Sequence, residues 1–79
     1  MKPRFRVYDK VTGQDVANGP LSLDIGYGAA TWIGMGHYGR PVSEDEAAEV
    51  EAAVLHWVRE WQPNRNRTVH TDRFNIVFL

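Results

Sequence analysis

The chain has 79 residues, with nine lysines and arginines, ten aspartates and glutamates, a formal charge of −1 and no cysteine. A chain of this size makes one domain with a thin core, because it buries only about 60% of the surface that its unfolded form exposes. The composition excludes a disulfide-stabilised scaffold and disfavours direct nucleic-acid binding, which normally requires a strongly basic surface. No window approaches the roughly 18 apolar residues of a membrane span, and no apolar run typical of a signal peptide follows residues 1–6. We therefore expect a single cytoplasmic domain over residues 1–79 that crosses no membrane.

The first half of the chain predicts strands. Apolar and polar residues alternate over residues 4–8, which indicates a strand with one buried face. Turn-forming residues follow at 10–14 and at 18–20, where asparagine and glycine tolerate a positive φ. Residues 21–27 show the cleanest alternation in the chain, and residues 31–35 are a candidate for a further strand.

A helix is predicted over about residues 43–62. Ser43 followed by Glu46 is the signature of a capping box, in which each residue bonds a backbone N–H of the other. Apolar residues then recur at spacings of three and four on one face, and they are Ala47, Val50, Val54, Trp57, Val58 and Trp61. Pro63 stops the helix, because proline cannot continue the hydrogen-bond ladder.

After a polar loop at residues 64–67, Phe74, Ile76 and Phe78 form one face of a last predicted strand. The order is strand, strand, strand, helix, strand. It predicts an α+β fold, with an antiparallel sheet of about four strands and one amphipathic helix packed on one face. The other face of the sheet is left to solvent or to a partner. Such a small sheet is compatible with a monomer or with a homodimer formed through an open edge or face.

Two groups of residues suggest chemistry at first sight. The glycines of residues 34–39 match G-x-G-x-x-G, which in dinucleotide-binding folds leads directly into a helix that receives a pyrophosphate. Here the predicted helix begins only beyond Pro41, and the chain is too short for that fold. The histidines, His37, His56 and His70, have no chelating spacing. We therefore expect no catalytic residues, no metal and no cofactor, and so no enzyme.

Acidic residues are concentrated at the start of the predicted helix. They are Glu44, Asp45, Glu46, Glu49 and Glu51. Acids in a first turn favour the helix dipole by about 0.3–1 kcal/mol each, but the effect fades before Glu49. Asp45 and Glu49 lie on the helix face opposite the apolar stripe, flanked by Ala48 and Ala52. Such an acidic strip could bind a basic groove and imitate the phosphates of nucleic acid.

A second set of charges, the basic set, lies elsewhere in the chain. It consists of Arg4, Arg6, Arg65, Arg67 and Arg73. Arg65 and Arg67 alternate with asparagines, which suits phosphate contacts. Solvation, together with the helix dipole near the C-terminus of the helix, explains the same residues without a ligand. We expect a bipolar molecule, acidic at the helix start and basic at the helix end, whose field steers association with a charged partner.

In its size, its strand–helix–strand order and its acidic residues 44–51, the chain resembles small cysteine-free α+β proteins of phages and mobile elements that block host machinery. Among these it most resembles the anti-CRISPR proteins, through the architecture of the whole chain and without a shared motif. The resemblance implies a non-enzymatic inhibitor that acts in the host cytoplasm. It would bind a subunit of a multisubunit CRISPR effector and block binding of target DNA or recruitment of a nuclease. The residues leave two alternatives open: a small nucleic-acid-binding or regulatory module that uses the basic set, and a phage structural or assembly component.

Overall fold

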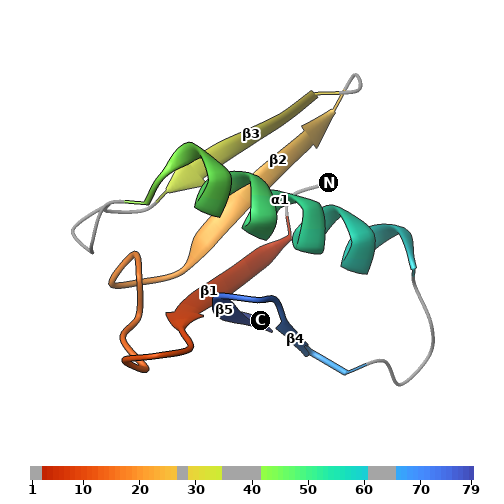
Figure 1. Ribbon diagram of the computed structural model, residues 1–79. Coiled ribbons are helices and arrows are strands. Elements are labelled where there is room, and N and C mark those ends of the chain that lie inside the picture. The colour runs from red at the N-terminus through yellow and green to blue at the C-terminus, as the bar shows by residue number, and fades with distance from the viewer. Residues whose placement is uncertain (1–2, 27–28, 35–41, 61–65) are drawn as a thin grey trace.

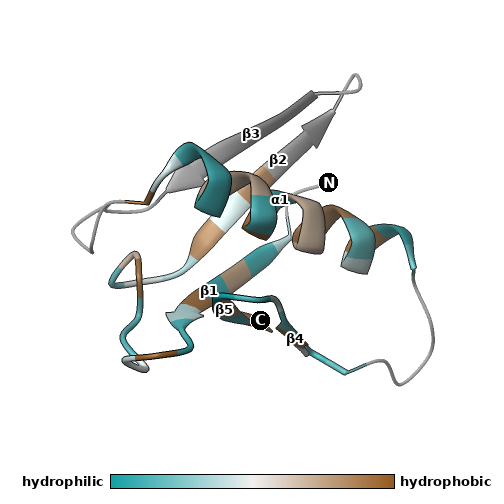
Figure 2. Cartoon of the chain, viewed as in Figure 1, coloured by the Kyte–Doolittle hydropathy of each residue, from teal (hydrophilic) through white to brown (hydrophobic). Residues whose placement is uncertain are grey.

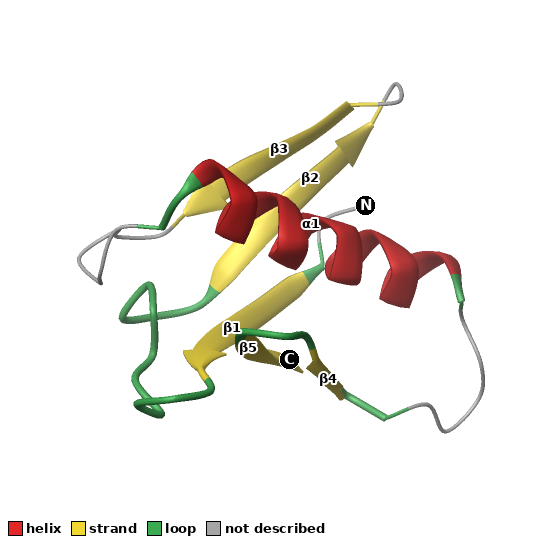
Figure 3. Ribbon diagram, viewed as in Figure 1, coloured by secondary structure: helices red, strands yellow, loops and turns green. Residues whose placement is uncertain are grey.

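A computed structural model describes residues 3–26, 29–34, 42–60 and 66–79. Five strands form one antiparallel sheet in the order β3-β2-β1-β5-β4. The helix α1 crosses one face of this sheet (Figure 1). In chain order the elements are β1 (Arg4–Asp9), β2 (Leu21–Gly26), β3 (Ala29–Gly34), α1 (Glu44–Arg59), β4 (Thr68–His70) and β5 (Phe74–Phe78). The α+β class, with an antiparallel sheet and one helix, is therefore confirmed (Figure 3).

The edge strand β4 was not predicted from the sequence. It has three residues, too few for an alternating pattern to stand out. It exists because it pairs with β5, where Val69 lies opposite Ile76 and His70 opposite Asn75. The turn between the two strands is closed by a hydrogen bond of 2.8 Å from the backbone N–H of Thr71 to the carbonyl of Phe74. The chain after the helix thus returns as a hairpin that packs beside β1.

Asp9 organises the turn after β1. Its Oδ1 accepts hydrogen bonds from the backbone N–H groups of Val11 (2.8 Å) and Thr12 (3.3 Å). Its carbonyl accepts from Gly13, whose φ of 74° favours glycine. Asn18, in the second predicted turn, also has a positive φ, of 55°. The first turn coincides with the segment predicted at 10–14, whereas the second is closed by a hydrogen bond of 3.3 Å from the backbone N–H of Asn18 to the carbonyl of Asp15 and so begins before the predicted residues 18–20.

Helix α1 begins where the sequence predicted. Ser43 Oγ accepts from the backbone N–H of Glu46 (3.2 Å), and Glu46 Oε1 accepts from the backbone N–H of Ser43 (3.1 Å), which is a capping box. The prediction ran to about residue 62, whereas the last helical residue is Arg59. A proline disfavours continuation of a helix through it, because its ring clashes with the carbonyl four residues earlier, and Pro63 itself lies outside the described residues. In the part of the chain that the structure describes, no helix has the length and apolar character needed to cross a membrane.

The hydrophobic core lies between α1 and the sheet. Val50 and Val54 of the predicted stripe are buried, Trp57 packs against the core from its margin, and Trp61 lies outside the described residues. The buried residues are Phe5, Val7, Val16, Ala17, Leu21, Leu23, Val50, Val54, Phe74, Ile76 and Phe78. Burial of each larger side chain contributes roughly 1.5–3 kcal/mol. The alternation that predicted β1 is visible along its ribbon (Figure 2), and its apolar residues Phe5 and Val7 are buried in the core.

Of the glycine pattern at residues 34–39, only Gly34, the last residue of β3, belongs to the described part of the chain. The strand predicted at residues 31–35 corresponds to β3, which begins and ends slightly earlier.

Candidate functional site

The start of α1 and the turn between β4 and β5 meet at one corner of the molecule. We call this the acidic corner and define it by Glu44, Asp45, Glu46, Glu49 and Asp72. Glu44, Asp45 and Asp72 are exposed, whereas Glu46 and Glu49 are partly buried. Two segments that are distant in sequence therefore bring acidic residues to the same corner.

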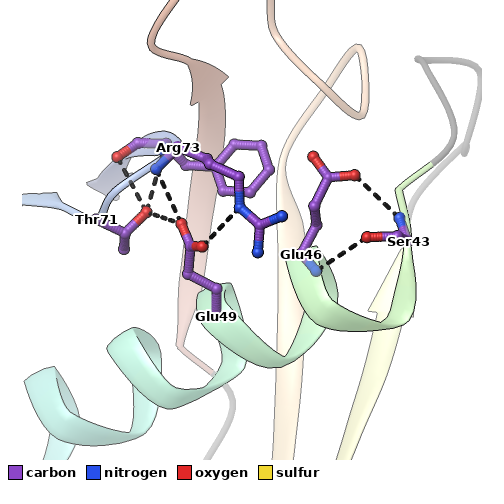
Figure 4. A network of polar contacts seen from close by, with 6 residues as sticks. Ser43, Glu46, Glu49, Thr71 and Arg73 are labelled. Atoms are coloured by element: carbon purple, nitrogen blue, oxygen red, sulfur yellow. Dashed lines mark hydrogen bonds and ion pairs between the residues drawn. The ribbon is translucent and has the colours of Figure 1, made fainter.

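Glu49 holds the two segments together (Figure 4). Its Oε2 accepts a hydrogen bond of 2.5 Å from Thr71 Oγ1 and one of 3.0 Å from the backbone N–H of Arg73. Its Oε1 accepts from Arg73 Nε at 2.8 Å, which makes an ion pair. We call this arrangement of Glu49, Thr71 and Arg73 the Glu49 clamp. It fixes the β4–β5 turn on the first half of the helix.

The clamp sets the protonation of its members. Partial desolvation raises the pKa of Glu49, but the hydrogen bonds from Thr71 and Arg73 and the positive charge of Arg73 outweigh it and lower this pKa below its ordinary value. The hydrogen bond to Glu49 likewise raises the pKa of Arg73. Asp45 and Glu46 contribute to that rise through their negative charge. Glu49 is thus an ionised carboxylate at neutral pH, and Arg73 stays charged.

The clamp removes Glu49 from the exposed acidic strip that the sequence predicted. The sequence placed Glu49 beside Asp45 on the exposed face of the helix, but the side chain of Glu49 is only 18% exposed. The reason is that the β4–β5 turn covers the side chain of Glu49. This turn follows β4, the strand that was not predicted from the sequence. Glu46 is occupied by the capping box, and Glu51 is half-buried. The predicted site residues with exposed carboxylates are therefore Glu44 and Asp45.

Sequence reasoning did not assign Thr71 or Asp72 to this site. Both precede β5 directly, in a short run of turn-forming residues before an apolar strand. That run was the available signal for a hairpin. It could have indicated that the turn comes back to the helix, although not which helical residue it would meet.

The fold divides the basic set. Arg4, at the start of β1, and Arg67 lie on either side of the end of β5, where their carbonyls accept from Leu79 (3.0 Å) and Phe78 (2.7 Å). Arg73 lies near the opposite end of β1, at the acidic corner. The predicted separation of acidic and basic ends is therefore wrong for Arg73, because its ion pair with Glu49 draws it to the helix start.

The remaining members of the basic set are placed differently again. Arg6 donates to Asp15 Oδ2 at 3.3 Å, and this ion pair partly neutralises the middle of β1. Arg65 lies outside the described residues. Of the described members of the basic set, Arg6 and Arg73 are therefore in ion pairs, and Arg4 and Arg67 lie at the end of β5.

The histidines contribute no metal-binding geometry in the described part of the chain. His70 Nδ1 lies 2.6 Å from Asn75 Oδ1, across the β4–β5 pair, so its described partner is an amide. His56 is exposed on α1, and His37 lies outside the described residues. Among the described residues, no three histidines, aspartates or glutamates come together as metal ligands would.

The acidic corner can accept hydrogen bonds and ion pairs from cationic side chains. Carboxylates of this kind bind arginine in a bidentate manner and lysine as a point charge. The hydroxyl of Thr71 donates to Glu49 and accepts from the backbone N–H of Phe74 (3.0 Å), so its hydrogen bonds hold the turn beside the helix. Comparison of the chain with protein-family models, with curated proteins and with solved structures gives no match.

Proposed function

We propose that this protein is a non-enzymatic inhibitor of a host defence complex. It acts in the host cytoplasm in the manner of an anti-CRISPR protein, by binding a subunit of a multisubunit CRISPR effector and blocking target DNA. One observation carries the proposal: Glu44 and Asp45 are exposed at a corner that the capping box and the Glu49 clamp hold in place. Neighbouring exposed carboxylates resemble the phosphates of a nucleic-acid strand in charge and suit a groove lined by arginine and lysine.

The hydrogen bonds at the corner support this function energetically. Binding costs free energy when side chains or loops must be ordered at the interface, and a preorganised surface reduces that cost. Asp72 adds a third exposed carboxylate from the β4–β5 turn, whose neighbours Thr71 and Arg73 are held by Glu49. Arg73 offsets one negative charge, so the corner remains negative.

The internal role of Glu49 decides how the proposal is tested. Reversal of its charge would release the β4–β5 turn and confuse loss of contact with loss of structure. Glu44 and Asp45 are better positions, because both are exposed and neither belongs to the capping box or to the clamp.

The experiment uses the double variant Glu44→Lys/Asp45→Lys and a panel of purified multisubunit CRISPR effectors with their target DNA. We expect the variant to bind the inhibited effector at least about tenfold more weakly and to restore its binding to DNA, because close charge pairs at interfaces contribute this much or more. The matched comparison is Asp45→Lys against Glu60→Lys. Each variant replaces a negative charge by a positive one at an exposed residue, and the two residues lie at opposite ends of α1.

Glu60→Lys should bind within about twofold of the unaltered protein, since isolated surface charges contribute little. Circular dichroism establishes that each variant is folded. Full inhibition by a folded double variant would exclude the acidic corner as the binding surface. Absence of inhibition of every effector by the unaltered protein would count against the function itself.

The geometry supports the nucleic-acid-binding alternative less well than it supports protein binding through the acidic corner. Arg6 and Arg73 are in ion pairs, and Arg4 and Arg73 lie near opposite ends of β1. Phosphate-driven binding is strongest at low salt, so a gel shift with single-stranded and duplex DNA and RNA under those conditions would reveal it.

A further inference from the structure

The strands at the two edges of the sheet differ in length and composition. β4 has only three residues, whereas β3, with six residues of sequence AATWIG, has no charge and no proline. Among the strands that the structure describes, β2 is the only one that pairs with β3. Edge strands in natural proteins are usually short, charged or interrupted by proline, because their outward N–H and C=O groups can pair with another chain. β3 has none of these protections.

We propose that a second copy of this chain pairs antiparallel with β3, so that two sheets join into one continuous sheet about a two-fold axis. A copy is favoured over a different protein because an uncharged strand meets no like-charge repulsion when it lies opposite itself. A two-fold interface also requires a surface that is complementary to itself. Whether β3 meets this requirement depends on its register.

A two-fold axis perpendicular to the sheet places residues of the same face opposite each other. Thr31 lies opposite Asp24 of β2, and Trp32 lies opposite Leu23, so these two positions belong to different faces. With Thr31 opposite its own copy at the axis, Ala30 comes opposite Trp32 of the partner subunit and Ala29 opposite Ile33 of the partner subunit. In this register each large residue type of the strand is aligned with a small one.

The threonine at the axis also fits this register. Thr–Thr pairs are among the cross-strand combinations that stabilise antiparallel sheets. The strand is therefore complementary to itself in size, in charge and at its central pair. This inference does not depend on the proposed function, since it concerns β3 and not the acidic corner.

The first test measures the mass of the protein in solution by light scattering over a range of concentrations up to about 100 µM. We expect the unaltered chain to reach twice the 9.0 kDa mass of one copy. Thr31→Lys should remain at the mass of one copy, because it would place two positive charges opposite each other at the axis. Thr68→Lys is the matched control, since it makes the same substitution on β4, the other edge strand, and should leave the dimer intact. Circular dichroism verifies that both variants are folded.

A second test uses cysteine variants, so that it does not depend on whether the lysine variant folds. The natural chain has no cysteine, so a single introduced cysteine reports only on its own position. Residues directly opposite in an antiparallel pair have Cα atoms about 4.5–5.5 Å apart, within the range of a disulfide. Thr31→Cys should therefore form a covalent dimer under mild oxidation, and Thr68→Cys should form much less. A monomeric unaltered chain, a dimer that persists in folded Thr31→Lys, or equal crosslinking of the two cysteine variants would overturn the proposal.

Discussion

The two ends of α1 contact the same hairpin, β4–β5, through different chemistry. At the N-terminal end the contact is the Glu49 clamp, made of hydrogen bonds and an ion pair near the surface. Near the C-terminal end, the ring of Trp57 stacks on Phe78 with centroids 3.8 Å apart and an angle of 3° between planes. Trp57 Nε1 also donates to the carbonyl of Asn66 at 3.0 Å. We call this second contact the aromatic end.

The aromatic end and the Glu49 clamp differ in what they contribute: the first mainly stabilises the fold, and the second mainly positions the β4–β5 turn. A hydrogen bond exchanged with water contributes only about 0.5–1.5 kcal/mol, whereas buried aromatic surface contributes more. The aromatic end should therefore carry most of the free energy that holds the helix to the hairpin. The clamp, which is directional, should mainly decide where the turn with Asp72 lies and which charges remain exposed.

The largest expected effect is that of Trp57→Ala. It removes both the stacked ring and the hydrogen bond to Asn66, and it should lower the free energy of unfolding by about 3 kcal/mol. Urea unfolding followed by circular dichroism measures this loss. Trp57→Phe keeps one aromatic ring to stack on Phe78 but removes the N–H donor and the five-membered ring, so we expect a smaller loss of about 1–2 kcal/mol. Equal losses in the two variants would mean that stacking contributes little.

A smaller effect is expected at the other end. Glu49→Ala removes the acceptor of the clamp and should cost about 1–2 kcal/mol, since its contacts are partly exposed to solvent. The backbone N–H of Arg73 should also exchange faster with solvent, because its acceptor is Glu49. Asp45→Ala, one helical turn earlier, is the control and should cost at most about 1 kcal/mol, the contribution of one first-turn acid to the helix dipole. The comparison fails if Glu49→Ala is as costly as Trp57→Ala.

The smallest effect is a pH dependence confined to the clamp. Because the folded-state pKa of Glu49 lies below its ordinary value of 4.5, its contribution is fully present above pH 4.5 and is lost as the pH falls through the folded pKa. The difference in unfolding free energy between the unaltered protein and Glu49→Gln should therefore be constant from about pH 7 to about pH 5 and narrow below it. Urea unfolding at several pH values measures it. The difference in unfolding free energy between the unaltered protein and Trp57→Phe should not change with pH. If the differences for Glu49→Gln and Trp57→Phe changed with pH in parallel, the clamp would not be the source of the pH dependence.

Much of the fold could be predicted because it rests on short-range patterns. The strands β1, β2 and β5 follow from a period of two, and α1 from a period near 3.6. The capping box needs only Ser43 and Glu46, which are three residues apart. The helix end and β4 were not predicted, since both depend on few residues whose conformation is set by their neighbours in space.

The candidate site was predictable as a concentration of acidic residues and no further. The partners of Glu49 lie 22 and 24 positions away along the chain, and no local pattern relates them. Composition and periodicity thus determined the fold class, the start of the helix and the presence of an acidic segment. Only the tertiary structure decided which carboxylates are neutralised and which stay exposed, because that depends on how the β4–β5 hairpin packs against α1.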